Sequence, residues 1–152
     1  MSIHRTIQEL GYSLPATAKP VGVYLPAVRS GKLVFTAGQL PIRDGELIAI
    51  GKVPTDVSLE AAADAARQAV LNALAAVETV AESVDDIARI VRMNVFVNSA
   101  EGFTDQAKLA NAASELLGEI FGDAGAHSRC AVGVAELPLN APVEIDLIVE
   151  LR

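Results

Sequence analysis

The sequence predicts a single α+β domain in which one β-sheet carries two helices on one face. Its 152 residues are close to the length of one domain. Strand-like and helix-like segments follow one another in the order ββ(β)αβαββ, and no low-complexity segment or linker interrupts them. We expect residues 1–20, which end in a proline, to form an N-terminal arm, and residues 21–152 to form the domain.

Turn signals divide the first part of the domain into strands. The segments Val21–Arg29 and Leu33–Ala37 flank Ser30-Gly31-Lys32, in which glycine can supply a positive φ. A second tight turn is expected at Asp44-Gly45, followed by a short strand at Glu46–Ile50.

Two helices are predicted from apolar residues at three- and four-residue steps. The first begins after Ser58, a suitable N-cap, and runs to about Ala81 with many alanines that allow close approach to a sheet. The second spans Phe103–Phe121 and should stop at Gly122. The remaining strands are expected at Asp86–Asn98, Ser128–Ala135 and Val143–Leu151. Helices on one face leave the other face uncovered, which favours an oligomer.

Composition excludes several function classes. The net charge is −7 and the 12 basic residues are scattered, which argues against nucleic acid and anionic membranes as partners. A single cysteine, Cys130, excludes an internal disulfide and fits a reducing compartment, and no His/Cys spacing suggests a zinc site. Neither a signal peptide nor an apolar run of membrane-spanning length is visible, so we expect a cytoplasmic protein.

The strand at 128–135 carries the main candidate, Arg129. Side chains alternate along a strand, so one face carries small residues and the other is apolar: Arg129, Ala131, Gly133 and Ala135 against Cys130, Val132 and Val134. We expect the apolar row to face the core. A guanidinium beside small residues has room to bind a carboxylate bidentately. The alternative is a strand-end arginine that pairs with Asp or Glu.

Acidic residues alternate with apolar ones along the last strand, and Glu144 is the candidate among them. If this strand neighbours the strand of Arg129, their apolar faces coincide and Glu144 lies on the same polar side as Arg129. A carboxylate there could hold a water or relay a proton. The alternative is an acid that only solvates an exposed face.

Three other residues carry weaker signals. Tyr24 lies in the first strand, Asn111 lies inside an alanine-rich helix, and Gly38 ends a strand where backbone could approach a ligand. The alternatives are a packing residue, an incidental helix position and a plain turn. His4 and His127 are isolated in the sequence.

Five segments resemble, in unbroken order over about residues 21–151, the motifs of one known family. They are Val34–Pro41, similar to a strand with SGQ(I/L)P; Ala66–Asn72, similar to ARQ-xxx-N; Val91–Val97, similar to a VFV strand; Arg129–Pro138, similar to RSxVxVxxLP; and Val143–Ile145, similar to a VEI strand. Together they resemble the reactive-intermediate deaminase family (RidA/YjgF-like, formerly labelled L-PSP endoribonuclease). Ala37 and Cys130 stand where the motifs have serine.

The resemblance implies a fold, an assembly and an activity. The fold is chorismate-mutase-like (bacillus type) α+β, and three subunits associate with ligand clefts between them. The activity is a 2-iminobutanoate/2-iminopropanoate-type deaminase, which hydrolyses enamines and imines to 2-oxo acids and ammonia without metal or cofactor. The partner is then a small carboxylate-bearing imine or 2-oxo acid.

The resemblance also assigns roles to residues. Arg129 matches the arginine that binds the substrate carboxylate, and Glu144 matches the glutamate associated with the catalytic water. Tyr24 matches a cleft tyrosine, Gly38 a glycine that lines the site, and Asn111 a cleft asparagine.

Ala131 belongs to the same binding site and stands where many members have cysteine. That departure keeps open a non-catalytic trimer that binds small carboxylates. An endoribonuclease is a further alternative, which the net charge opposes.

Overall fold

The computed structural model describes residues 2–16 and 23–152. The helices are α1 (Ile3–Glu9), α2 (Leu59–Val77) and α3 (Gln106–Phe121), and short 3-10 turns lie at Val84–Asp86, Gly122–Gly125 and Pro138–Asn140. The strands are β1 (Ala27–Ser30), β2 (Leu33–Thr36), β3 (Ile42–Arg43), β4 (Glu46–Leu47), β5 (Ile87–Asn98), β6 (Ser128–Val134) and β7 (Val143–Leu151). The order expected from the sequence is confirmed, with one additional short strand, β3, before the Asp44-Gly45 turn.

The boundaries differ from expectation mainly near the N-terminus. The first strand begins at Ala27, not Val21; residues 21–22 lie outside the described part of the chain, and 23–26 are not in the strand. The turn at Asp44-Gly45 joins two strands, because the residues before it also pair, and both its residues have positive φ. The expected helix stop is confirmed, since Gly122 has φ +62°.

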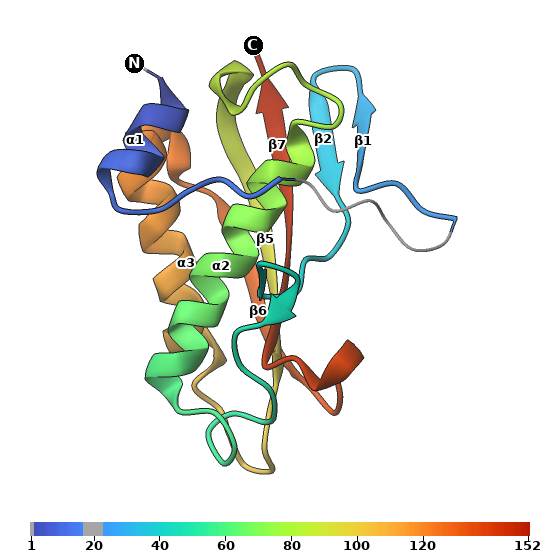
Figure 1. Ribbon diagram of the computed structural model, residues 1–152, viewed down its shortest axis with the longest axis vertical. Helices are drawn as coiled ribbons and strands as arrows, with labels where there is room; N and C mark the ends of the chain where they lie inside the picture. Colours follow the sequence, from blue (N-terminus) through green and yellow to red (C-terminus); the bar gives the residue numbers. More distant parts are fainter. Residues whose placement is uncertain (1, 17–22) are drawn as a thin grey trace.

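Five strands form one sheet in the order β1-β2-β7-β5-β6. All neighbours are antiparallel except β5 and β6, which run parallel because α3 carries the chain back between them. The helices lie on one side of this sheet, and β6 is an edge strand (Figure 1). The two short strands β3 and β4 form a separate hairpin near α2.

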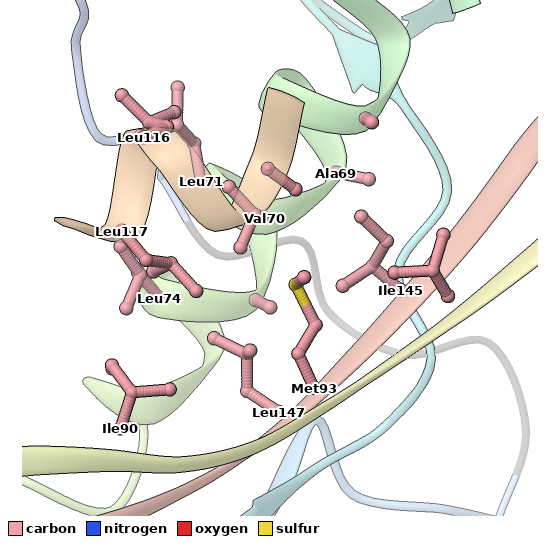
Figure 2. Packing of buried hydrophobic residues seen from close by; sticks show 14 of the residues in the cluster. Ala69, Val70, Leu71, Leu74, Ile90, Met93, Leu116, Leu117, Ile145 and Leu147 are labelled. Carbon is pink, nitrogen blue, oxygen red and sulfur yellow. The ribbon is translucent and has the colours of Figure 1, made fainter. Parts of the chain in front are cut away.

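The core lies between the sheet and the two long helices (Figure 2). The buried side of β5 and β7 faces α2 with Met93, Ile145 and Leu147, and each fully buried side chain of this size stabilises the fold by about 1.5–3 kcal/mol. The expected N-cap is confirmed, because Oγ of Ser58 accepts a hydrogen bond from the amide of Ala61. Nearly every α2 residue from 65 to 77 is buried.

The sheet face opposite the helices is open in the single chain and carries exposed apolar side chains. Val28, Phe35 and Val132 are 51%, 41% and 40% exposed, and the register places them all on this face. Val28 and Phe35 pair directly across β1 and β2, and neighbouring exposed apolar side chains of this kind favour an interaction site.

The prediction that the apolar row of β6 faces the core is wrong. Cys130 pairs with Asn94 and Val132 with Phe96, both on the open face, while Arg129 pairs with the buried Met93. The physical reason is that α3 lies over this edge strand, where the small residues fit beneath it and Arg129 finds polar partners.

The N-terminal helix is docked on the domain. Ile7 is buried, the amide of Ile3 donates to Oδ1 of Asp85 at 2.5 Å, and His4 pairs with Glu78 at 2.7 Å. The helix therefore packs against α3 and the turn after α2. Over residues 2–16 and 23–152, no helix has the length and apolar character needed to cross a bilayer.

Candidate active site

Arg129 projects from β6 toward α3, which supplies all its hydrogen-bond partners. Its Nη1 donates to Oδ1 of Asn111 at 2.9 Å and to Oγ of Ser114 at 3.1 Å, and its Nη2 donates to the carbonyl of Ala107 at 3.4 Å. These partners are uncharged, and no carboxylate among the described residues pairs with Arg129. The guanidinium is therefore fixed in place while its charge stays available to an anion.

Small residues follow Arg129 along the same face of β6. Ala131 pairs with the buried Val95, and two residues further Gly133 lies against polar side chains. A Cβ on Gly133 would come within 2.7 Å of Oγ of Ser99 and 2.8 Å of Nε2 of Gln106. On this face of β6, only small residues therefore lie next to the guanidinium. The polar side chains of Ser99 and Gln106 lie further along the strand, against Gly133.

Two residues that the sequence did not single out belong to the Arg129 cluster. Oγ of Ser114 lies 3.0 Å from Nε2 of His127, and Nδ1 of His127 lies 2.6 Å from the carbonyl oxygen of Gly125. His127 is therefore not isolated. The available signals were the position of His127 two residues before Arg129, at the entry to β6, and the i, i+3 spacing of Asn111 and Ser114 on one helix.

Glu144 and Gly38 lie against each other. A Cβ on Gly38 would meet Oε2 of Glu144 at 2.7 Å, so only glycine leaves room for this carboxylate position. Residue 38 is held there because Gln39 and Ile145 exchange backbone hydrogen bonds of 2.7 and 3.0 Å. The glycine therefore brings its backbone against the carboxyl group.

The loop after Gly38 is anchored to α2 by a chain of side chains. Nδ2 of Asn72 donates to the carbonyls of Leu40 and Ile42, at 2.9 Å each. Gln68 donates to Oδ1 of Asn72 at 3.0 Å and accepts from Nε of Arg43 at 2.9 Å. The ARQ-xxx-N segment therefore has a structural role: its side chains fix the loop that follows Gly38, the residue in contact with Glu144.

Two neighbouring carboxyl groups on the open face have raised pKa values. Burial, and then the nearby charge of Asp146, raises the pKa of Glu144. Burial also raises the pKa of Asp146, although a 2.9 Å hydrogen bond from Asn94 and the charge of Arg92 oppose this. A carboxyl whose pKa is raised toward neutrality can both accept and release a proton.

Tyr24 stands apart from these groups. It lies three residues before β1 and is 56% exposed, and no hydrogen bond of its side chain occurs within the described residues. Within the described residues, therefore, no hydrogen bond joins it to Arg129 or to Glu144.

The expectation that Arg129 and Glu144 share one side of the sheet is wrong. It assumed that their strands are neighbours, but β5 lies between β6 and β7. Glu144 pairs with Phe96 on the open face, whereas Arg129 pairs with Met93 on the helix-covered face. The predicted residues thus form two groups: Arg129, Asn111 and Ala131 on one face, and Glu144 with Gly38 on the other.

Neither group lines either of two surface hollows found among the described residues. Two shallow hollows of about 350 Å³ and 360 Å³ are lined by other residues, including Arg29 and Arg152 in one, and Arg43 and Arg67 in the other. In the described part of the chain, no group of three or more His, Cys, Asp or Glu residues could hold a metal ion.

Comparisons with known proteins agree on one family. The family model described as "YjgF/chorismate mutase-like, putative endoribonuclease" matches residues 5–151. "Protein TCP17" of Trypanosoma cruzi is 40% identical over 147 residues, which cover 96% of this chain and 92% of that protein. The "2-iminobutanoate/2-iminopropanoate deaminase" of Escherichia coli strain K12 is 32% identical over 134 residues, which cover 87% and 90%.

A solved structure confirms the fold class. It is a "putative endoribonuclease" from Shewanella oneidensis MR-1, with a TM-score of 0.94 and 31% identity, and the match covers 99% of this chain and 100% of that one. The α+β sheet with its helices on one face is therefore the fold of this family.

Proposed function

The chain belongs to the YjgF/chorismate mutase-like family, and from this premise we propose that it hydrolyses reactive imines and enamines of amino acids to 2-oxo acids and ammonia. The observation that carries the proposal is the guanidinium of Arg129. It is held by uncharged groups of α3, beside small residues, with no carboxylate partner among the described residues. The relative named 2-iminobutanoate/2-iminopropanoate deaminase supports the substrate class.

In the proposed reaction Arg129 binds the carboxylate of the substrate through two parallel hydrogen bonds. An enamine first takes a proton from solvent at its β-carbon and loses one from its nitrogen, which gives the imine. Water then adds to the imine carbon: one water proton passes to Glu144 and the nitrogen takes a proton from solvent, which gives the carbinolamine. Glu144 returns its proton to the nitrogen as the C–N bond breaks and ammonia leaves, and the hydroxyl releases its proton to solvent as the C=O bond of the 2-oxo acid forms.

The two residue groups lie on opposite faces of one chain, so we propose that each site forms between two copies. The Arg129 group of one subunit meets the Gly38 and Glu144 group of a neighbour. The exposed apolar side chains of the open face support a homotrimer in which this face is covered. Exposed Tyr24 would join a site in the same way.

The test couples the purified protein to an enzyme that releases imines from amino acids. The 2-oxo acid is trapped with semicarbazide and its rate of appearance is compared with spontaneous hydrolysis. Arg129→Ala should lose substrate affinity worth about 2–5 kcal/mol, and Arg129→Lys should also fail because an ammonium cannot make the planar pair. No acceleration by the wild-type protein over several imines would refute the deaminase proposal.

The same experiment separates the alternatives. Carboxylate binding without turnover would favour a non-catalytic binding trimer, an outcome that Ala131 in place of cysteine leaves open. The endoribonuclease description of the family gives a third candidate. RNA cleavage that disappears in Arg129→Ala would favour that one, although the net charge of −7 opposes RNA binding. We place the reaction in the cytoplasm, which the single cysteine fits.

A further inference from the structure

The environment of Arg129 contains a chain of hydrogen bonds whose direction can be worked out. A carbonyl oxygen only accepts, so the 2.6 Å contact with Gly125 places a proton on Nδ1 of His127. In the neutral ring, Nε2 is then an acceptor, and the hydroxyl of Ser114 donates to it at 3.0 Å. Oγ of Ser114 is left to accept from Nη1 of Arg129 at 3.1 Å.

Every donor in this chain points the same way, from the guanidinium to Ser114, to His127 and to the backbone of Gly125. Hydrogen bonds in such a sequence polarise and strengthen one another. The second N–H of Nη1 donates a hydrogen bond to Oδ1 of Asn111 at 2.9 Å. Both protons of Nη1 are therefore engaged by protein groups.

The remaining edge of the guanidinium is the one suited to a carboxylate. Nη2 makes one long contact, 3.4 Å, to the carbonyl of Ala107, and Nε makes none within the described residues. Nε–H and the Nη2 proton beside it point in parallel, which is the arrangement that binds two carboxylate oxygens side-on. Because protein groups occupy Nη1, the Nε–Nη2 edge of the guanidinium is the one that can bind a ligand.

We propose that Ser114 and His127 are positioning residues, which hold Nη1 of Arg129 so that its Nε–Nη2 edge receives the carboxylate of a small 2-oxo or 2-imino acid. This inference rests on the proposed function and deepens it. Neither residue needs to touch the substrate. Ser114 must supply a hydroxyl that both accepts from Arg129 and donates onward, and His127 must supply an acceptor nitrogen.

The chemistry of the pair predicts which substitutions preserve the arrangement. Ser114→Ala removes the hydroxyl, whereas Ser114→Thr keeps it. His127→Asn can still donate to the carbonyl of Gly125 but offers Ser114 no acceptor at the former Nε2 position. If His127 only fastens the start of β6 to the preceding turn, His127→Asn should behave as the wild type.

The test measures binding of 2-oxobutanoate and of its amide, 2-oxobutanamide, by calorimetry. Ser114→Ala and His127→Asn should each weaken 2-oxobutanoate binding about tenfold, which corresponds to about 1.4 kcal/mol, and leave amide binding unchanged. Ser114→Thr should restore the affinity for the acid. In turnover assays the two weakened variants should raise KM with kcat nearly unchanged, the pattern of lost uniform binding.

Two matched controls exclude general effects. Ser128→Ala removes a neighbouring hydroxyl that bonds to Val91 and Arg92 instead of Arg129, and His4→Asn changes a histidine that pairs with Glu78. Both should bind 2-oxobutanoate as the wild type does. If Ser114→Ala does not fold, as judged by thermal melting, His127→Asn and Ser114→Thr carry the test.

The outcomes separate this inference from the proposed function. If Arg129→Ala loses 2-oxobutanoate binding while Ser114→Ala and His127→Asn bind normally, the positioning role is overturned and the proposed anchor stands. If Arg129→Ala itself binds 2-oxobutanoate as the wild type does, the anchor and the positioning role both fail. Equal weakening of acid and amide in the variants would show a structural role and would also overturn the inference.

Discussion

The proposal that each site is shared between subunits makes a quantitative prediction for mixtures of inactive variants. Arg129→Ala removes the carboxylate anchor on one sheet face, and Glu144→Gln removes the proton-transfer group on the other. Because β5 separates their strands and their side chains point to opposite faces, a subunit defective in one residue should still contribute the other to its neighbour.

The expected recovery follows from counting sites in a ring. In a random 1:1 assembly each site draws its Arg129 side from one subunit and its Glu144 side from the next, so about one quarter of the sites are intact in both. The mixture should therefore regain about a quarter of the wild-type rate, although each variant alone is nearly inactive. The variants are co-expressed with different tags, purified as mixed assemblies and assayed by semicarbazide trapping.

A second mixture provides the control. Wild type mixed 1:1 with the double variant Arg129→Ala/Glu144→Gln should also show about one quarter of the activity if sites are shared, but about one half if each site lies within one chain. Mixed assemblies of the single variants that show only the sum of their separate rates would refute the shared site.

Four further predictions concern stability, assembly and the Glu144 side of the site. Gly38→Ala should fold normally but lower kcat, because its Cβ displaces the Glu144 carboxylate, as rate assays with melting curves would show. Asn72→Ala should lower the free energy of unfolding in urea by about 1–3 kcal/mol, since two loop carbonyls lose their donor. Val132→Glu should dissociate the proposed trimer in light scattering; a wild-type monomer at micromolar concentration would contradict the proposed assembly. Burial raises the pKa of Glu144 and of Asp146 in the folded protein, so their stabilising contribution is present below the unfolded pKa and lost as pH rises through the folded value. Glu144→Gln should therefore raise the melting temperature more at about pH 7 than at about pH 4, and an equal shift at both would contradict this.

Local chemistry was sufficient to predict most elements of the fold. The alternation along Val143–Leu151, the cap at Ser58 and the stop at Gly122 each depend on neighbours in the sequence, and the structure confirms all three. The N-terminal arm was harder to predict from local sequence, because the burial of Ile7 depends on tertiary packing.

The orientation of β6 could not be read from its own residues. Hydrophobicity alone favours burying the row of Cys130 and Val132, yet the structure turns that row outward. Two influences from elsewhere decide the matter: α3 offers polar partners to Arg129 across the helix-covered face, and the apolar row can be covered by another chain. The contact of Ser114 with His127 depends on the same packing, and no short motif encodes it.

The alanine-rich packing of α2 has a consequence for how this protein tolerates change. Small buried residues such as Ala69 allow α2 to lie close to the sheet, and the same helix carries Asn72, which donates hydrogen bonds to two carbonyls of the loop after Gly38. Ala69 faces Ile145 across this separation (Figure 2). A larger residue such as valine at Ala69 would push the helix outward, at a typical cost of about 1–3 kcal/mol for overpacking, and would carry the loop with it. The packing of α2 on the sheet and the position of the loop after Gly38 are therefore coupled through Asn72. Ala69→Val should accordingly lose turnover at urea concentrations far below its unfolding midpoint. Some positions remote from the chemistry would then behave as functional positions.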